Sequence, residues 1–278
     1  MSAAVSRVGL IGLGKMGRPI AGHLARGGFA VTGFDVSPDA VAAAAALGIR
    51  TAGCPREVAV GSDLAIVLVG FDAEVEEVVF GADGLLAGLA PGGIVAVAST
   101  VAPHYMRDLA ERAAACGAVA LDVPLCRGER AAADGKLLVM GGGDEAPFER
   151  CRPALHTFAD AIFHLGPVGA GQVGKMANNL ILWTCISGNS EAMRLAGSLG
   201  VAPDALRAAL LESSASNWAL ATRAETNPMP WAEKDMTIVL KEADAEGLSL
   251  PLCGVVKEVI KDVKARAGAP TPKPRTSA

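Results

Sequence analysis

The feature that most constrains this chain is a glycine-rich run near its N-terminus. Gly12-Leu13-Gly14-Lys15-Met16-Gly17 has the spacing G-x-G-x-x-G and follows a strand-sized apolar segment, Val8–Ile11. A helical pattern continues from the run to about Arg26, and a second strand is predicted at Ala30–Phe34. A strand, a glycine turn and a helix in this order predict a βαβ unit that binds a dinucleotide.

Each glycine of the run has its own predicted part. Gly12 permits the tight turn, Gly14 lets the backbone approach a pyrophosphate, and Gly17 lets the helix pack closely on the strand. The N-terminus of the helix offers N–H donors and a positive dipole end to the phosphates. A purely structural glycine turn is the alternative. We predict that the cofactor is bound by the whole run, Gly12, Leu13, Gly14, Lys15, Met16 and Gly17.

Asp35 stands directly after the second predicted strand. An acid at this place accepts hydrogen bonds from the ribose hydroxyls of adenosine and repels a 2′-phosphate. No lysine or arginine occurs within Phe34–Pro38. The sequence therefore predicts NAD rather than NADP as the cofactor. The alternative is that Asp35 only caps a turn.

The first half of the chain alternates strand-sized apolar runs with helical patterns. This alternation predicts βαβ units and a parallel sheet. Val69, at the end of the third strand, is expected to line the cofactor site. The further strands are predicted at Leu64–Val69, Ile94–Ala98, Val119–Val123 and Leu137–Met140, and the helices at Pro38–Leu47, Val75–Phe80 and Tyr105–Cys116.

The second half has a different pattern, without a clear strand from Gly169 on. Gln172 to about Leu199 predicts one long helix, and its apolar residues lie on most faces, as is typical of a buried helix. Shorter helices are predicted at Pro203–Glu212, Trp231–Glu246 and Leu252–Ala267. We expect an α/β fold with a Rossmann-like N-terminal domain over residues 1–168 and an all-α substrate and dimerisation domain over residues 169–268. A long interdomain helix joins them, and residues 269–278 form a loose tail.

Composition and charge exclude several classes of function. Hydrophobic residues make up 51% of the chain and charged residues 19%, which is too apolar for a disordered protein. The net charge is −4 and no basic patch stands out, so nucleic acid is not an expected partner. No apolar run reaches the roughly 18–20 residues of a membrane-spanning helix, and no signal-peptide pattern opens the chain. The six cysteines lack zinc-binding spacing, so we expect no metal and a cytoplasmic protein with reduced thiols.

Five motifs follow one another along nearly the whole chain. They are Val8–Ala21, Ser99–Pro103 (S-T-x-x-P), Asp122–Gly128, Gly169–Asn179 (G-x-G-x-x-x-K-x-x-N-N) and Lys234-Asp235. Together they resemble the β-hydroxyacid dehydrogenase family, which includes 3-hydroxyisobutyrate dehydrogenase and tartronate semialdehyde reductase. The resemblance implies that Thr100 contacts the nicotinamide side of the cofactor. It also implies that Lys234 lies near the nicotinamide and that Asp235 belongs to the substrate site.

Lys175 is the predicted acid and base. It lies on the long helix, and Asn178 and Asn179 follow at i+3 and i+4, on the same helix face. An ammonium group there can donate a proton to a carbonyl oxygen as hydride arrives, and the neutral amine can accept one in the reverse direction. The family assigns substrate or lysine contact to one or both asparagines, and the sequence leaves that choice open. A solvated helix lysine is the alternative.

The Asp122–Gly128 segment departs from the family motif D-x-P-V-S-G-G. Cys126 stands where the family has serine, and Arg127 stands where it has glycine, before Gly128. The family places the substrate carboxylate at these positions, and arginine pairs well with carboxylate or sulfonate oxygens. An arginine here resembles the sulfolactaldehyde reductase branch. We expect a small anionic hydroxyacid or semialdehyde; the alternative has Arg127 in solvent or paired with Glu129.

Two apolar residues complete the predicted substrate site. Trp231 precedes the Lys234-Asp235 pair and would close over the substrate, although a plain core position is the alternative. Leu182, two turns along the long helix from Lys175, would give the pocket an apolar wall.

Two rival functions are compatible with a dinucleotide-binding fold of this kind. Imine reductases use a related fold but usually replace the catalytic lysine, and non-catalytic dinucleotide-binding relatives typically lose it or carry basic modules. Lys175 argues against both. One helical half-domain cannot cover so apolar a helix, which predicts a homodimer or homotetramer in which the helical domains pack together. An interdomain cleft is the expected place of the active site.

Overall fold

The computed structural model of the protein describes residues 4–223, 229–266, 268 and 272–274, and divides them between two compact units. The first unit runs up to Lys175 and the second begins at Met176. The expected domain limits, 1–168 and 169–268, stay a prediction. Of the expected loose tail, only residues 272–274 lie within the described part of the chain. None of the described helices is long and apolar enough to cross a membrane.

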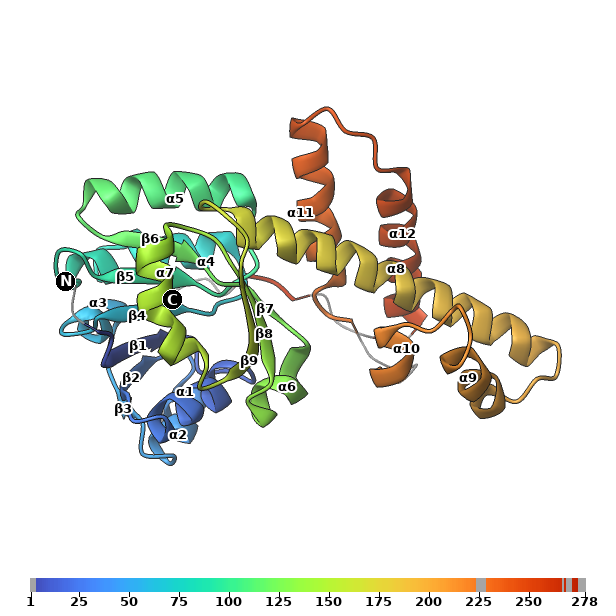
Figure 1. The fold of residues 1–278 in the computed structure, drawn as a ribbon, viewed down its shortest axis with the longest axis horizontal. Helices are drawn as coiled ribbons and strands as arrows, with labels where there is room; N and C mark the ends of the chain where they lie inside the picture. The colour runs from blue at the N-terminus through green and yellow to red at the C-terminus, as the bar shows by residue number, and fades with distance from the viewer. Residues whose placement is uncertain (1–3, 224–228, 267, 269–271, 275–278) are drawn as a thin grey trace. The chain divides into compact units, whose positions relative to one another are not determined.

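The first unit is built on a six-stranded parallel sheet with the strand order β3-β2-β1-β4-β5-β6 (Figure 1). The predicted strands at residues 30–34, 64–69 and 94–98 match β2, β4 and β5, the last two with shorter C-terminal ends. The strands are β1 (Arg7–Ile11), β2 (Ala30–Phe34), β3 (Arg50–Thr51), β4 (Leu64–Val67), β5 (Ile94–Val97) and β6 (Val119–Asp122).

Helices cover both faces of this sheet, with α1 and α2 on one side and α4 and α5 on the other (Figure 1). The parallel sheet and the Rossmann-like arrangement of the first unit confirm the predicted fold class. These helices are α1 (Gly17–Arg26), α2 (Pro38–Ala45), α3 (Pro55–Ala59), α4 (Asp72–Phe80), the short 3-10 turn η1 (Leu85–Ala87) and α5 (Pro103–Ala115).

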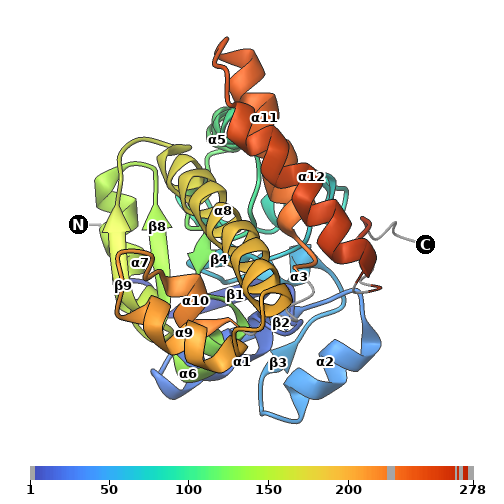
Figure 2. The same ribbon diagram turned by 90° about the vertical axis from the view of Figure 1, so that its right-hand side faces the viewer.

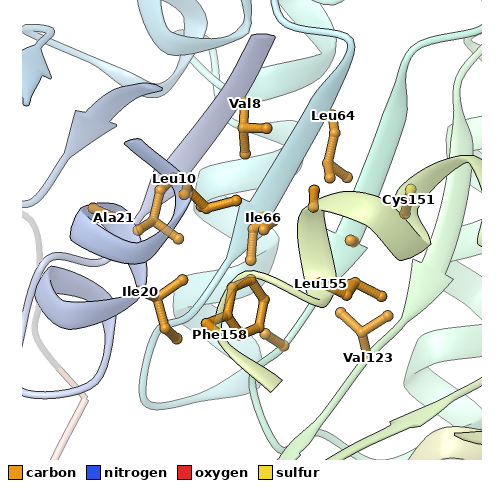
Figure 3. Close-up of a cluster of buried hydrophobic side chains, with 14 of the residues drawn as sticks. Val8, Leu10, Ile20, Ala21, Leu64, Ile66, Val123, Cys151, Leu155 and Phe158 are labelled. Carbon is orange, nitrogen blue, oxygen red and sulfur yellow. The ribbon is translucent and has the colours of Figure 1, made fainter. Parts of the chain in front are cut away.

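Successive residues of the central strands enter two different cores. Leu10 and Ile66 belong to the core on the α1 side, which also contains Phe158 (Figure 3). Ile11 and Val67 belong to the core on the α4 and α5 side. A strand buried on both faces needs no polar positions, which explains why these strands are continuous apolar runs.

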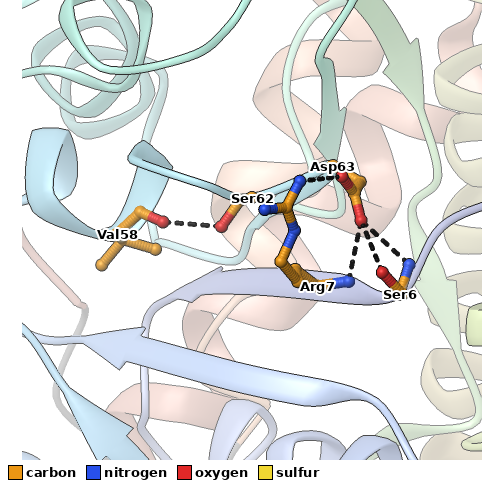
Figure 4. A network of polar contacts seen from close by, with 5 residues as sticks. All are labelled: Ser6, Arg7, Val58, Ser62 and Asp63. Atoms are coloured by element: carbon orange, nitrogen blue, oxygen red, sulfur yellow. Dashed lines mark hydrogen bonds and ion pairs between the residues drawn. The ribbon is translucent and has the colours of Figure 1, made fainter.

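Hydrogen bonds and an ion pair join β1 to β4 at the amino-terminal edge of this sheet (Figure 4). Asp63 accepts hydrogen bonds from the main-chain N–H groups of Ser6 and Arg7, at 3.0 and 2.9 Å, and from the Arg7 guanidinium at 2.7 Å. The start of β4 is thereby tied to the start of β1. The Arg7 guanidinium holds the pKa of the Asp63 carboxyl well below its usual range.

A second, three-stranded sheet completes the first unit. It consists of β7 (Leu125–Cys126), β8 (Leu137–Gly141) and β9 (Ala159–His164), and β7 pairs antiparallel with β8. Helices α6 (Gly128–Asp134) and α7 (Glu145–Leu155) connect these strands. The sequence predicted β8 but not its separate sheet. A two-residue strand and a strand that contains Asp160 lack the apolar periodicity by which strands are recognised.

The second unit, in its described part, contains helices only. The long helix α8 (Ala170–Ser198) starts in the first unit and agrees with the predicted helix over residues 172–199. Helices α11 and α12 run side by side in both views (Figures 1 and 2) and form a core with Trp183 of α8. The remaining helices are α9 (Pro203–Leu211), α10 (Trp218–Thr222), α11 (Ala232–Ala245) and α12 (Pro251–Arg266).

As the sequence predicts, the helical unit of one chain does not cover α8 all round. Ile181 and Leu195 on α8 are 64% and 63% exposed, because α11 and α12 cover only part of its circumference. Helix α9 contains no buried residue at all. The helical unit therefore leaves apolar surface uncovered.

Candidate cofactor and active site

The glycine turn after β1 has two positions at which the backbone excludes any side chain. Gly12 has φ +96°, and a Cβ there would lie 2.1 Å from the carbonyl oxygen of Leu68. A Cβ on Gly17 would lie 1.8 Å from the carbonyl oxygen of Gly12. At Gly14, by contrast, a Cβ would meet no atom of the protein within 4 Å. Packing within the chain does not require glycine at Gly14, so the open space fits the close approach of a pyrophosphate.

The Asp35 carboxylate is bound to the same turn. The Leu13 N–H donates to Oδ2 and the Ser37 N–H donates to Oδ1, each at 2.8 Å. The turn-capping role that the sequence left open is therefore present. The contact of this carboxylate with the ribose hydroxyls of the cofactor stays a prediction.

Val69 and Thr100 follow neighbouring strands, β4 and β5, at the same edge of the sheet as the glycine turn. Ser99 links their segments: its Oγ accepts from the Val69 N–H at 2.8 Å and donates to the Val67 carbonyl at 3.3 Å. This is the carboxyl edge, where ligands bind in open α/β sheets. The structure thus places the predicted cofactor residues of the first unit along one edge.

Lys175 is half-buried in the first unit, near the end of β7. Its Nζ donates a hydrogen bond of 2.6 Å to the carbonyl oxygen of Leu125 and lies 3.8 Å from Sγ of Cys126. Lys175 is therefore not a solvated helix lysine. The structure brings it together with Cys126 of the predicted substrate segment, across 49 positions of sequence.

Arg127 is not a free guanidinium. It donates to the Lys136 carbonyl at 2.9 Å and forms an ion pair with Asp160 on β9. The alternative pairing with Glu129 is wrong, because Arg127 pairs with Asp160 and the Glu129 carboxylate lies 3.7 Å from Lys15. The Arg127 side chain remains 34% exposed. Spacing along the chain cannot reveal Asp160, which is 33 positions away.

Arg127 also has an unusual backbone. Its φ is +82°, in the left-handed region that favours glycine, and Gly128 follows with φ +80°. A non-glycine residue in this region is destabilised by about 1–2 kcal/mol. The two hydrogen bonds of the guanidinium hold the strained residue in place.

Asn178 and Asn179 follow Lys175 on α8. The Asn178 Nδ2 donates to Oδ1 of Asn179 at 2.9 Å. Asn179 is only 3% exposed, whereas Asn178 is partly exposed. Of the two amides, that of Asn178 is the accessible one.

The remaining predicted residues lie in the second unit, and the structure gives two of them structural contacts. Asp235 is 6% exposed and accepts a hydrogen bond of 3.0 Å from the indole N–H of Trp183. Leu182 packs against the helical core. Trp231 is exposed, with the Lys234 Nζ 5.9 Å from its ring centre. The substrate contacts predicted for these residues stay predictions.

Two buried polar residues, Asp122 and Gln172, are not among the predicted site residues. Asp122 ends β6 and Gln172 lies in the first turn of α8, and neither has exposed surface. Burial raises the pKa of the Asp122 carboxyl, and the main-chain N–H groups of Gly169 and Gln172 oppose this rise. In the sequence, only their polar side chains and their places within the family motifs pointed to Asp122 and Gln172.

Two family models match the chain, one for each half. The NAD binding domain of 6-phosphogluconate dehydrogenase matches residues 7–166. The NAD-binding domain of NADP-dependent 3-hydroxyisobutyrate dehydrogenase matches residues 169–272. Both descriptions name NAD binding, and the second also names an NADP-dependent enzyme.

Relatives of known name agree with these matches. An NAD-dependent L-serine dehydrogenase of Pseudomonas aeruginosa is 37% identical, covering 81% of this chain and 75% of that protein. A 3-hydroxyisobutyrate dehydrogenase of the same organism is 34% identical, covering 91% and 90%. The solved structure of Mycobacterium tuberculosis 3-hydroxyisobutyrate dehydrogenase with L-serine has a TM-score of 0.85 and 26% identity, covering 96% of both chains. The chain therefore belongs to the β-hydroxyacid dehydrogenase family and is an NAD(P)-dependent dehydrogenase.

Proposed function

We propose that this enzyme interconverts a small anionic β-hydroxyacid, or its sulfonate analogue, and the corresponding semialdehyde, with NAD(H) as the cofactor and Lys175 as acid and base. The observation that carries the proposal is the position of Lys175. Its Nζ is bound to the Leu125 carbonyl beside Cys126, in the segment where the family binds substrate.

The bound nicotinamide supplies or accepts the hydride. In the reducing direction, the Lys175 ammonium donates its proton to the carbonyl oxygen of the semialdehyde. In the oxidising direction, the neutral amine takes the hydroxyl proton. The Leu125 carbonyl accepts one of the three donors of Nζ and so orients the other two.

Asn178 is the residue we assign to the substrate hydroxyl, because its amide is accessible while that of Asn179 is buried. The Cys126 thiol and the main chain of Gly128 would bind the carboxylate end. Asp35 supports NAD over NADP, since a fixed carboxylate at the end of β2 repels a 2′-phosphate.

The substrate class follows from the relatives and from Arg127. L-serine and 3-hydroxyisobutyrate, which the relatives' names give, are small β-hydroxyacids. Arg127 would add a clamp for a carboxylate or a sulfonate. Its ion pair with Asp160 weakens this second assignment, because a substrate anion has to share or replace that partner.

One experiment tests the proposal directly. NADH oxidation is measured with sulfolactaldehyde and with succinic, tartronic and methylmalonic semialdehydes, and NAD reduction with L-serine and 3-hydroxyisobutyrate. Preference for sulfolactaldehyde assigns Arg127 to a sulfonate, and preference for a carboxylated substrate makes it at most a general anion clamp. No turnover of any of these compounds would contradict the substrate class.

The Lys175→Met variant tests the acid and base. It should lose at least about 100-fold in kcat, the usual order for a lost general acid, while NADH binding measured by fluorescence is retained. Full activity of this variant would overturn the role of Lys175. Retained binding with no turnover by the unaltered protein on any substrate would favour a non-catalytic dinucleotide-binding relative.

A further inference from the structure

Asp122 and Gln172 form a buried polar network that the proposed chemistry leaves unused. Both side chains have 0% exposure, so neither can contact a substrate or cofactor directly. Buried polar groups without full hydrogen bonding are costly. The bonds that satisfy these two groups show what they hold together.

Asp122 fixes the start of α8 to the end of β6. Its Oδ1 accepts from the Gly169 N–H and its Oδ2 from the Gln172 N–H, both at 2.8 Å. Donors at a helix N-terminus and the positive end of the helix dipole stabilise a buried carboxylate. Backbone encloses it on both sides, since a Cβ on Gly142 or Gly171 would come within 2.5 or 2.8 Å of its oxygens. The Asp122 carboxylate therefore has little freedom to move and holds the start of α8 against the end of β6.

Both the oxygen and the nitrogen of the Gln172 amide bind main-chain groups of one loop. Its Oε1 accepts from the Val101 N–H at 3.2 Å, and its Nε2 donates to the Ser99 carbonyl at 2.9 Å. These two bonds bracket Thr100, the residue expected on the nicotinamide side. Ser99 extends the link to β4 through the Val69 N–H.

Lys175 lies three residues after Gln172, within one turn of the same helix. The start of α8 therefore holds both the Thr100 loop, through Gln172, and Lys175. A proton donor and a hydride carrier must be held in the reactive geometry, and a misplacement of about 1 Å can cost about 100-fold in rate.

We propose that Gln172, held by Asp122, is a positioning residue that sets the Thr100 loop and Lys175 at a fixed distance for coupled hydride and proton transfer. This inference rests on the proposed role of Lys175. It requires that loss of the amide bonds lowers kcat while cofactor binding is retained.

The Gln172→Glu variant gives the sharpest test. A protonated carboxylic acid has one acceptor and one donor, like the amide, so it can make both bonds. An ionised carboxylate turns an oxygen toward the Ser99 carbonyl and loses one of them. Burial raises the pKa of a carboxyl group. The kcat of the variant relative to the unaltered enzyme should therefore rise about tenfold or more as the pH falls from about 9 to about 6.

The Gln172→Leu variant should show no such pH-dependent recovery. It should lose about 10- to 100-fold in kcat, with the dissociation constant of NADH changed less than about threefold. Use of deuterated NADH should give a larger isotope effect on kcat than in the unaltered enzyme, because misalignment slows hydride transfer itself.

Two buried serines provide a matched control. The Ser99→Ala and Ser62→Ala variants each lose a buried hydroxyl that donates to a main-chain carbonyl. Ser99 belongs to the network, whereas Ser62 lies at the opposite edge of the sheet (Figure 4). Ser99→Ala should lower kcat and Ser62→Ala should not. Equal effects of the two would exclude the Ser99 hydroxyl from the positioning network.

The outcomes separate this inference from the proposed function. An inactive Lys175→Met variant with a fully active Gln172→Leu variant overturns the positioning role alone. An active Lys175→Met variant overturns the proposed function instead. If Gln172→Leu does not fold, Gln172→Glu still decides: a kcat equal to that of the unaltered enzyme at a pH where the introduced carboxyl is ionised contradicts the proposal.

Discussion

At Arg127, the cost of the strained backbone can be compared with the stabilisation from the side chain. Its left-handed backbone costs about 1–2 kcal/mol relative to glycine, and its ion pair with Asp160, with side chains 34% and 50% exposed, returns at most about 1 kcal/mol. The ion pair therefore does not outweigh the backbone strain. Stability alone therefore does not explain the arginine.

The Arg127→Gly variant should accordingly unfold within about 1 kcal/mol of the unaltered protein in urea. If Arg127 binds the substrate anion, kcat/KM for the preferred semialdehyde should fall about tenfold or more, which corresponds to the loss of a charged hydrogen bond. Asp160→Asn is the control, because it frees the guanidinium and should leave KM equal or lower. Unchanged kcat/KM in both variants would make Arg127 purely structural.

Asp35 carries the predicted cofactor preference. The Asp35→Ser variant removes the negative charge and keeps one acceptor for the turn, so its ratio of kcat/KM for NADP to that for NAD should rise about tenfold. Initial rates with both cofactors measure this ratio, and the melting temperature checks the turn. An unaltered enzyme that already prefers NADP would contradict the NAD prediction.

Asp63 allows a prediction for the elements β1 and β4, whose starts it joins (Figure 4). The pKa of Asp63 is lowered, first by the Arg7 guanidinium, so the folded state favours the ionised form. This stabilisation is fully present above the unfolded pKa of about 3.9 and is lost as the pH falls further.

The Asp63→Asn variant should therefore lower the free energy of unfolding by about 1 kcal/mol at pH 7, a value reduced by solvent screening. The difference should shrink at about pH 3. Urea unfolding at both pH values measures it. Asp134→Asn, which removes an exposed carboxylate 3.9 Å from Arg130, is the control and should have little effect. An equal loss in the two variants would contradict the prediction.

Apolar patterns in the sequence predicted some of the strands and missed others. The starts of β2, β4 and β5 agree with the apolar runs because buried parallel strands carry no polar interruption. Strands β7 and β9 escaped prediction because one has two residues and the other contains Asp160. Their pairing depends on β8, which is a tertiary partner.

At the scale of the whole molecule, the helical unit leaves large apolar side chains exposed. Helix α9 buries none of its residues. We predict that these surfaces pack against a second copy in a homodimer or homotetramer. The exposed side chains include Ile181, Leu195, Leu199, Trp218, Leu252 and Val255.

Light scattering at micromolar concentration should show an oligomer for the unaltered protein. The Leu195→Glu/Leu199→Glu double variant should be a monomer, because two buried charges oppose association. Leu47→Glu is the control, since Leu47 is also exposed, at 58%, but lies in the first unit. A monomeric unaltered protein would refute the prediction.

The sequence by itself determined the dinucleotide-binding unit, the long helix with Lys175, and the family. Glycine spacing and helical periodicity are local properties, so their physical causes lie within one turn or one strand. Only the tertiary structure decided that Arg127 pairs with Asp160, that Lys175 meets the Leu125 carbonyl, and that Gln172 holds the Thr100 loop. Those contacts join residues 33, 50 and 71 positions apart, and such distances in sequence become contacts only when the sheets and α8 are assembled.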